Sequence, residues 1–341
     1  MPKYFYLLPV LLMFLTEACS LPLTPSVSPM TPAPAASQTA TPTEPAAVPT
    51  ATIVPLGSPA NPVVFALPPS LQPEQIADGK ALADGLSRYT GYTIAVTRPN
   101  SYADLVADFG KGNAHLAFLP PFAYVDAYQK GYVRAILATQ RFGTYVYGAQ
   151  FIANTRNNFV SYYDELNGQN KADAKTALSQ FDGYKPCWDD PLSAAGYVIP
   201  LGFLNENGVR TKPPAFVEGH STVVRSIYAQ GICDFGATII DARQSPAVLE
   251  DLPDVTRRVQ VIWRIEPLIP YEVVVVASSM PDDLRFTLTQ TLAQLTQTAE
   301  GQTAMQNIYK IEALQPVNDD AYALFRHYVK TSGLDLSTLF K

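Results

Sequence analysis

The 341-residue sequence has few of the residues that would point to metal or nucleic-acid chemistry. Its three histidines, His115, His220 and His327, have no spacing typical of a metal site, so no metal is expected. There are 24 basic and 30 acidic residues and no basic cluster, which argues against a nucleic-acid partner. Catalytic signature strings with a nucleophile beside a base are also missing. We therefore predict no catalytic residue and no cofactor.

Hydrophobic runs long enough to span a bilayer are lacking at the N-terminus. The apolar run 4–15 follows Lys3 and is about a dozen residues long, which is typical of a secretory signal. It ends at Thr16-Glu-Ala-Cys19, which resembles the lipobox of bacterial lipoproteins. That resemblance implies export over residues 1–19 and a lipidated Cys19 on the outer face of the cell membrane. Simple cleavage of the signal is the alternative.

Residues 20–60 have almost no charge. The segment holds ten of the thirty prolines, one acidic residue (Glu44) and no lysine or arginine. It cannot bury enough apolar surface to offset the entropy of ordering, so we expect a disordered, polyproline-like tether. Such a tether suits a domain held above a membrane, although it could also be a leader without a role.

From Asn61 onward the chain alternates strand and helix patterns, which indicates an α/β fold. Expected strands include 63–67, 115–119, 183–188, 233–238 and 271–277, and the last is almost continuously β-branched, as in a strand covered on both faces. Two lobes of this kind form a clamshell, in which ligands collect where strand ends face a crevice. Cys187 and Cys233 lie on expected neighbouring strands of an exported domain, so we predict a disulfide between them.

The segment 187–197 combines a strand, a turn and the start of a helix. Backbone N–H groups at a helix start lack partners, and together with the helix dipole they can bind an anion. Ser193 fits the N-cap position and could add its hydroxyl. Alternatively, Ser193 only caps a core helix and nothing binds there.

Four blocks are spread in order over the whole domain: Ser101-Tyr-Ala with Gly112 to Tyr124, Asp190-Pro-Leu-Ser-Ala-Ala-Gly-Tyr197, Gly219-His220 with the strand from Cys233 and Asp241, and Ile269-Pro-Tyr-Glu-Val273. Together they resemble the periplasmic substrate-binding proteins of phosphate/phosphite/phosphonate ABC transporters. The resemblance implies a type II binding-protein fold with discontinuous lobes joined by two hinge crossings. Lobe 1 would hold 62–145 plus 270–341, and lobe 2 would hold 146–269.

The resemblance also implies a ligand site between the lobes. By position, the residues that would hydrogen-bond an oxyanion or line its site are Tyr102, Tyr124, Tyr147, Ser193, Ala194, Ala195 and His220. Glu272 and Asp241 would face the other end of the ligand. Each has a structural alternative: Tyr102 could cap its helix, His220 could be a loop histidine, and Glu272 could be an exposed hinge acid.

The two alanines are the main departure from the family's pattern. Ala194 and Ala195 stand where the family has Thr and Ser, so two hydroxyl donors are missing while the backbone N–H groups remain. The resemblance implies a monomeric, lipid-anchored receptor that presents a small oxyanion to an ABC permease and ATPase. A ligand-sensing or orphan binding protein is the alternative, and an enzyme on this fold is a third.

Overall fold

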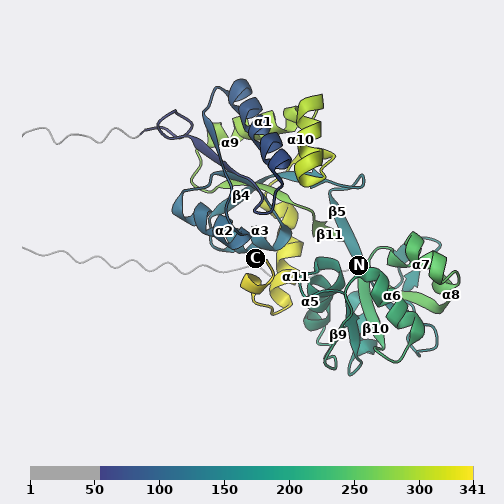
Figure 1. Cartoon of the computed structure of the whole chain (residues 1–341). Coiled ribbons are helices and arrows are strands. Elements are labelled where there is room, and N and C mark those ends of the chain that lie inside the picture. The colour runs from purple at the N-terminus through teal and green to yellow at the C-terminus, as the bar shows by residue number, and fades with distance from the viewer. Residues whose placement is uncertain (1–53, 341) are drawn as a thin grey trace, which may run out of the picture. The chain divides into compact units, whose positions relative to one another are not determined.

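A computed structural model describes residues 54–340, whose strands form two main sheets and one short hairpin (Figure 1). In order across the six-stranded sheet, the strands are β13 (Ala313–Pro316), β4 (Val133–Gln140), β12 (Val273–Ala277), β3 (Leu116–Leu119), β1 (Val63–Ala66) and β2 (Ile94–Thr97). In the five-stranded sheet they are β11 (Val259–Pro270), β5 (Val146–Asn154), β10 (Phe235–Ile239), β8 (Pro186–Trp188) and β9 (Ala215–Phe216). The hairpin pairs β6 (Tyr163–Asp164) with β7 (Gln169–Asn170).

Strand β12 is central to the six-stranded sheet and is buried on both faces. It pairs antiparallel with β3 on one side and β4 on the other, and all five of its residues are buried. Val274 and Val276 face one hydrophobic cluster, whereas Val273 and Val275 face another. The period of two and the β-branched side chains explain why this segment forms a strand covered from both sides, as predicted.

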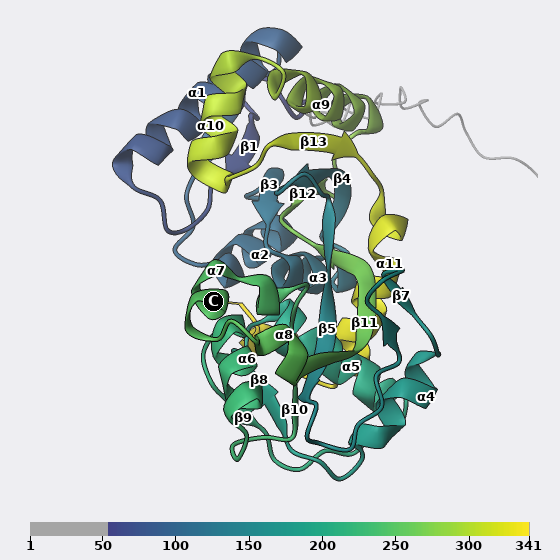
Figure 2. The ribbon, with the colours of Figure 1, turned by 90° about the vertical axis from the view of Figure 1, so that its right-hand side faces the viewer.

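Helices cover both faces of the six-stranded sheet (Figures 1 and 2). On one face lie α1 (Pro73–Thr90), α9 (Asp282–Leu295) and α10 (Ala299–Tyr309). On the other lie α2 (Tyr102–Lys111) and α3 (Pro121–Gln129). Ser101 caps α2 by accepting the N–H of Asp104 at 3.0 Å, which fixes where that helix, and Tyr102 at its first position, begins.

The five-stranded sheet packs against α5 (Ile199–Glu206) and α6 (His220–Ala229). β8 and β10 are parallel neighbours, and Cys187 and Cys233 beside them form a disulfide with Cα atoms 5.6 Å apart. The predicted bridge is therefore present in the structure. Further helical segments between β7 and β11 are α4 (Ala174–Leu178), η1 (Ser179–Phe181), η3 (Ala242–Gln244), α7 (Pro246–Asp251) and α8 (Val255–Arg258).

Two neighbouring strands carry the chain between the sheets (Figure 2). β4 leads into β5, and β11 leads back into β12, while Ile269 and Pro270 at the end of β11 pair with Tyr147 and Val146. The C-terminal segment adds a connection that the sequence did not predict. After β13, the chain passes through η4 (Asp319–Tyr322) into α11 (Ala323–Thr331) and then η5 (Leu336–Thr338), and α11 packs against α5 of the other sheet.

The folded part begins before the expected end of the tether. Gly57 accepts the N–H of Thr93 at 2.7 Å, Ser58 forms a bridge with Asn61, and Leu56 packs against the core. Residues 54–60 therefore belong to the ordered domain, because their backbone groups and one apolar side chain find partners there. The expected signal, Cys19 and the rest of the tether lie outside the described residues. Among residues 54–340, no helix has the length and apolar character needed to cross a membrane.

Candidate functional site

The helix predicted at Ser193 begins there, and its first turn is π-helical. Ser193 Oγ accepts the N–H of Gly196 at 3.0 Å, and Ser193 O accepts the N–H of Val198 at 3.0 Å. The π-helical turn η2 (Ala194–Val198) runs directly into α5. Within the described residues, the backbone N–H groups of Ala194 and Ala195 have no acceptor. Two donors at the positive end of a helix are therefore free for an anion.

Asp189 lies directly against this helix start. Its side chain is only 7% exposed, and a Cβ at Gly196 would collide with its carboxylate, so only glycine permits this approach. Oδ2 is 3.1 Å from His220 Nδ1, although the contact lacks hydrogen-bond geometry. Oδ1 has no hydrogen-bond partner among the described residues. A buried carboxylate oxygen thus lies against Gly196 in the first turn of this helix.

His220 is the first residue of α6, and its ring approaches Asp189 from that side. Burial lowers the pKa of His220, and the negative charge of Asp189 opposes that effect without reversing it. The imidazole is consequently neutral near pH 7. An anion that arrives beside it would favour the protonated ring.

A second group of polar side chains lies where the chain crosses between the sheets. Arg141, just after β4, donates from Nη2 to Glu272 Oε1 at 2.5 Å and to Tyr309 O at 2.5 Å. Glu272 precedes β12, and burial raises the pKa of its carboxyl while Arg141 opposes the shift. Burial also raises the pKa of Tyr102 to about 12, with the charge of Glu272 adding to the effect. Glu272 is thus a partly buried, paired acid.

Tyr147 lies at the start of β5, where that strand pairs with Ile269 at the end of β11. Burial raises the pKa of its hydroxyl, and the charges of Glu272 and Asp189 both contribute. Its ring lies 5.0 Å from that of Tyr271, which holds it between the strands. The structure thus brings Ser193, Ala194, Ala195 and His220 together around one helix start, and it pairs Glu272 with Arg141 at the crossing.

Two residues named from the sequence have other partners. Tyr124 is fully buried in α3, where its hydroxyl donates to Asp319 Oδ1 at 2.8 Å and accepts from Arg326 Nη1 at 2.8 Å. Asp241 accepts hydrogen bonds from Gln150 Nε2 and Arg243 Nη2, each at 2.7 Å. Their hydrogen bonds within the protein account for both side chains without a ligand, so we leave them out of the site proposed below.

Asp189 and Arg141 lie among these polar groups, and the sequence reasoning did not name them. Two adjacent acids, Asp189 and Asp190, precede Pro191, and one acid is enough to begin the turn. The extra acid was therefore a sequence signal that Asp189 has another role. Arg141 offered a weaker signal, a lone cation in an extended crossing. Sequence spacing alone predicts neither the contact of Arg141 with Glu272 nor the contact of Asp189 with Gly196.

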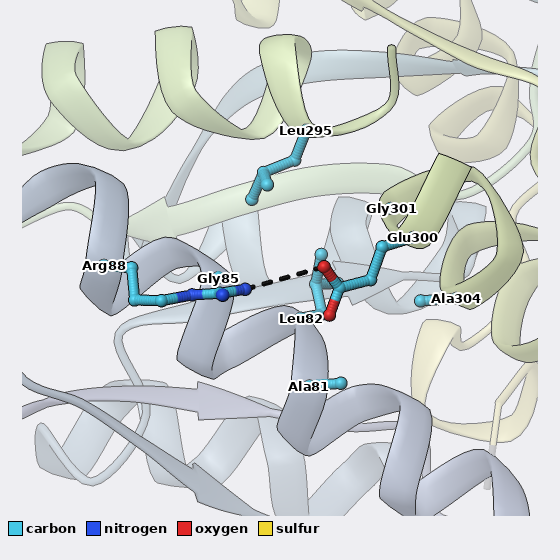
Figure 3. Close-up of a pocket in the computed structure, with 8 residues that line it drawn as sticks. All are labelled: Ala81, Leu82, Gly85, Arg88, Leu295, Glu300, Gly301 and Ala304. Carbon is cyan, nitrogen blue, oxygen red and sulfur yellow. Dashed lines mark ion pairs between the residues drawn. The ribbon is translucent and has the colours of Figure 1, made fainter. Parts of the chain in front are cut away.

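The hollow between α1 and α10 is too small for an oxyanion. Its volume is about 10 Å³, roughly one water molecule (Figure 3). Arg88 and Glu300 approach across it to 3.6 Å, and both are largely exposed, so their ion pair contributes little. Among residues 54–340, no group of three or more potential ligands is placed to hold a metal ion.

An α/β fold with two sheets and crossing strands between them is the fold of type II periplasmic binding proteins. The chain belongs to the family of ABC transporter phosphonate periplasmic substrate-binding proteins, whose model matches residues 65–322. It is 28% identical over 193 residues to the phosphate-import protein PhnD of Mycolicibacterium smegmatis (strain ATCC 700084 / mc(2)155), covering 53% of this chain and 55% of that protein. The chain thus spans about half the length of that curated relative.

Solved structures share the fold at low sequence identity. XAC2383 from Xanthomonas citri bound to chloride ion has a TM-score of 0.55 at 15% identity, over 81% of this chain and 98% of that one. The same protein bound to ATP has a TM-score of 0.54 at 15% identity, over 81% and 97%. At this identity the similarity establishes the arrangement of the strands and helices and leaves the ligand open.

Proposed function

We propose that this chain is the substrate-binding component of an ABC importer and captures a small oxyanion such as a phosphonate, phosphite or phosphate. The observation that carries the proposal is the pair of free N–H groups at Ala194 and Ala195, with His220 beside the same helix start. Backbone N–H groups at a helix start favour anions, and a histidine that can gain a proton adds charge. Membership of the phosphonate-binding family supports this ligand class.

In the proposed complex, the two lobes hold 62–145 with 270–341, and 146–269, and the ligand lies between them. The Ser193 hydroxyl accepts from Gly196, which leaves its own proton free to donate to the oxyanion. Tyr102 and Tyr147 keep their protons because their pKa values are raised, so both serve as donors. Glu272, held by Arg141, faces the other end of the ligand.

The same proposal covers the surroundings of the protein. The chain is exported and works outside the cytoplasm as a monomer, anchored through Cys19 and held off the membrane by its proline-rich tether. Its partners are a membrane permease and an ATPase, and it catalyses no reaction itself. The family to which it belongs consists of transporter binding proteins, which supports this assignment.

A thermal-shift screen of phosphate, phosphite and methylphosphonate, followed by titration calorimetry, tests the ligand class. We expect His220→Ala to weaken binding of the best ligand roughly ten- to hundredfold, because it removes a charge-assisted hydrogen bond. His327→Gln is the matched control, since His327 is exposed and pairs with Glu206 between α11 and α5, and a glutamine there can still donate to that carboxylate. Binding of none of the three oxyanions, or full affinity in the His220→Ala variant, would contradict the proposal.

A further inference from the structure

Phe142 is an exposed aromatic residue in a backbone conformation that bulky side chains rarely adopt. It follows β4 in a two-residue turn, which Arg141 and Thr144 close with two backbone hydrogen bonds of 3.0 Å. The φ angles are 52° at Phe142 and 74° at Gly143, in the left-handed region that favours glycine and asparagine. Packing of the Phe142 side chain does not offset this cost, because the residue is 85% exposed.

A carboxylate from a distant part of the chain fixes this turn. Glu312, just before β13, accepts the N–H of Phe142 at Oε1 and the N–H of Gly143 at Oε2, each at 2.9 Å. Its own N–H donates to Gln140 O at 2.9 Å, which continues the pairing of β13 with β4. Backbone strain that the surrounding structure holds in place is typical of functional sites, where it positions a group for binding or catalysis. In this turn the positioned group is the exposed ring of Phe142.

The ring of Phe142 is the outer member of a row of three aromatic rings. Its centroid is 6.5 Å from that of Tyr271, which in turn is 5.0 Å from that of Tyr147. Tyr271 lies between β11 and β12, whereas Phe142 lies between β4 and β5. The aromatic row (Phe142, Tyr271 and Tyr147) therefore joins the two crossings. One end is Tyr147, a donor in the proposed complex, and the other end is open to solvent.

The aromatic row lies at the edge of the six-stranded sheet where a ligand is expected. Val273 at the start of β12 pairs with Leu119 at the end of β3 and with Ala138 near the end of β4. Tyr271 and the turn after β4 are therefore beside the carboxyl end of β3, and open α/β sheets bind ligands at that edge. An apolar surface that begins at a ligand donor and continues to solvent suits the part of a ligand that points away from its charged group.

We propose that the aromatic row is a subsite for an aromatic substituent, so that the receptor prefers an oxyanion carrying an aryl group to methylphosphonate. An aryl group beside Phe142 would leave water and gain ring contacts, whereas a methyl group has far less apolar surface to bury. The inference rests on the proposed function, because it assumes that the charged end of the ligand is bound at the helix start. It adds the class of substituent and a residue, Phe142, that binds it.

Phenylphosphonate and methylphosphonate form a matched pair for the test, because they share the charged group and differ in the substituent. Titration calorimetry on the wild type should give phenylphosphonate at least about a tenfold higher affinity. In Phe142→Asn that ratio of affinities should fall to about threefold or less, because the outer ring of the aromatic row is missing. Phe142→Tyr keeps a ring at this position, so the ratio should stay near that of the wild type.

Thermal unfolding separates the loss of the ring from a loss of the fold. Asparagine adopts the left-handed conformation more readily than phenylalanine, so Phe142→Asn should melt at or above the wild-type temperature. Phe286→Ala is the control for removing an exposed phenylalanine, and its ratio of affinities should equal that of the wild type. Phe286 is 67% exposed on α9 and lies beside Ala135 near the start of β4, whereas the turn follows the end of that strand.

Different outcomes separate this inference from the proposed function. Equal affinities of the wild type for the two ligands, or a ratio that Phe142→Asn leaves unchanged, overturns the subsite and leaves the proposed function intact. An unchanged ratio would instead favour Phe142 as a contact for the membrane permease. If neither phosphonate binds, and phosphate and phosphite do not bind either, the proposed function fails and this inference fails with it.

Discussion

At the scale of single residues, the two alanines at the helix start decide how many donors the site offers. Ala194 and Ala195 are 8% and 2% exposed, so a hydroxyl at either position would be buried. In the free protein such a hydroxyl would have few partners, and a ligand would supply one. The same pair of changes should therefore act on stability and on binding in opposite directions.

We expect Ala194→Thr together with Ala195→Ser to tighten binding of phosphate or a phosphonate by about 1–3 kcal/mol, roughly ten- to hundredfold. The free variant should melt at a lower temperature than the wild type, and ligand should raise that temperature by more than it does for the wild type. Calorimetry and thermal unfolding measure the two effects. If the variant stays folded and still binds no phosphorus oxyanion, the ligand class suggested by the family is wrong for this chain.

His220 should take up a proton when the ligand binds. Burial lowers its pKa in the free protein and Asp189 opposes the shift, so the ring is neutral near pH 7. A bound anion favours the imidazolium and raises the pKa of His220. The affinity for the anion should therefore increase as the pH falls through the titration range of His220.

Calorimetry in buffers of different ionisation enthalpy measures the number of protons taken up at pH 7. The ligand's own proton exchange is present in every variant, so the difference between the wild type and His220→Gln isolates the histidine. His327→Gln should match the wild type. Equal proton uptake in all three proteins would show that His220 does not titrate with the ligand.

The residue scale also shows where prediction from the sequence stops. Ser193 could be placed at an N-cap because capping depends on local chemistry, and the structure puts it there. The pairing of Arg141 with Glu272 could not be predicted, because 131 positions separate the two residues and only the crossing strands bring them together. The close approach of the Asp189 carboxylate to the helix start depends on the absence of a side chain at Gly196. That contact is a matter of tertiary packing.

At the scale of elements, periodicity identified the strands and helices whose faces are buried uniformly. β12 and α9 are of this kind, since one is β-branched throughout and the other repeats leucine at helical spacing. The packing of α11 onto α5 was not predictable, because it joins the C-terminus to the other sheet. There Phe203 stacks on Tyr328 with ring centroids 3.7 Å apart, and Asn205 Nδ2 donates to Thr331 O and Ser332 O.

Two glycine-to-alanine changes should separate helix propensity from close packing. Gly202 in α5 lies against the backbone carbonyl of Tyr328, so a Cβ there would force α5 and α11 apart. We expect Gly202→Ala to lower the free energy of unfolding by about 1–3 kcal/mol despite the better helix propensity of alanine.

Gly85 in α1 is the matched control, because a Cβ there would meet Leu295 at an ordinary 3.5 Å. Gly85→Ala should raise the free energy of unfolding by about 0.4–1 kcal/mol, since alanine restricts the unfolded chain. Urea unfolding of both variants gives the comparison. If the two changes shift stability in the same direction, the α5–α11 contact is looser than the structure indicates.

At the scale of the whole folded part, the proposed lobes meet at three places along the chain. β4 leads into β5 and β11 leads into β12, which gives the two crossings expected from the family resemblance. The packing of α11 on α5 adds a third connection and should limit how far the lobes separate. In the proposed complex, Tyr102 and Glu272 belong to one lobe, whereas Ser193 and His220 belong to the other.

A ligand that contacts both sets of residues binds best when the lobes are together, so it should shift the population toward the closed form by its differential affinity. Small-angle scattering should therefore show a smaller radius of gyration with saturating methylphosphonate than without it. His220→Ala at the same ligand concentration should show less compaction, because fewer molecules are occupied. Asn205→Ala removes the hydrogen bonds from α5 to the end of α11, so the ligand-free radius should increase while the ligand-bound radius stays near that of the wild type. A radius of gyration that does not change at saturation would mean that the lobes are already closed before the ligand arrives. The ligand would then have to reach the free N–H groups of Ala194 and Ala195 without any opening of the hinge.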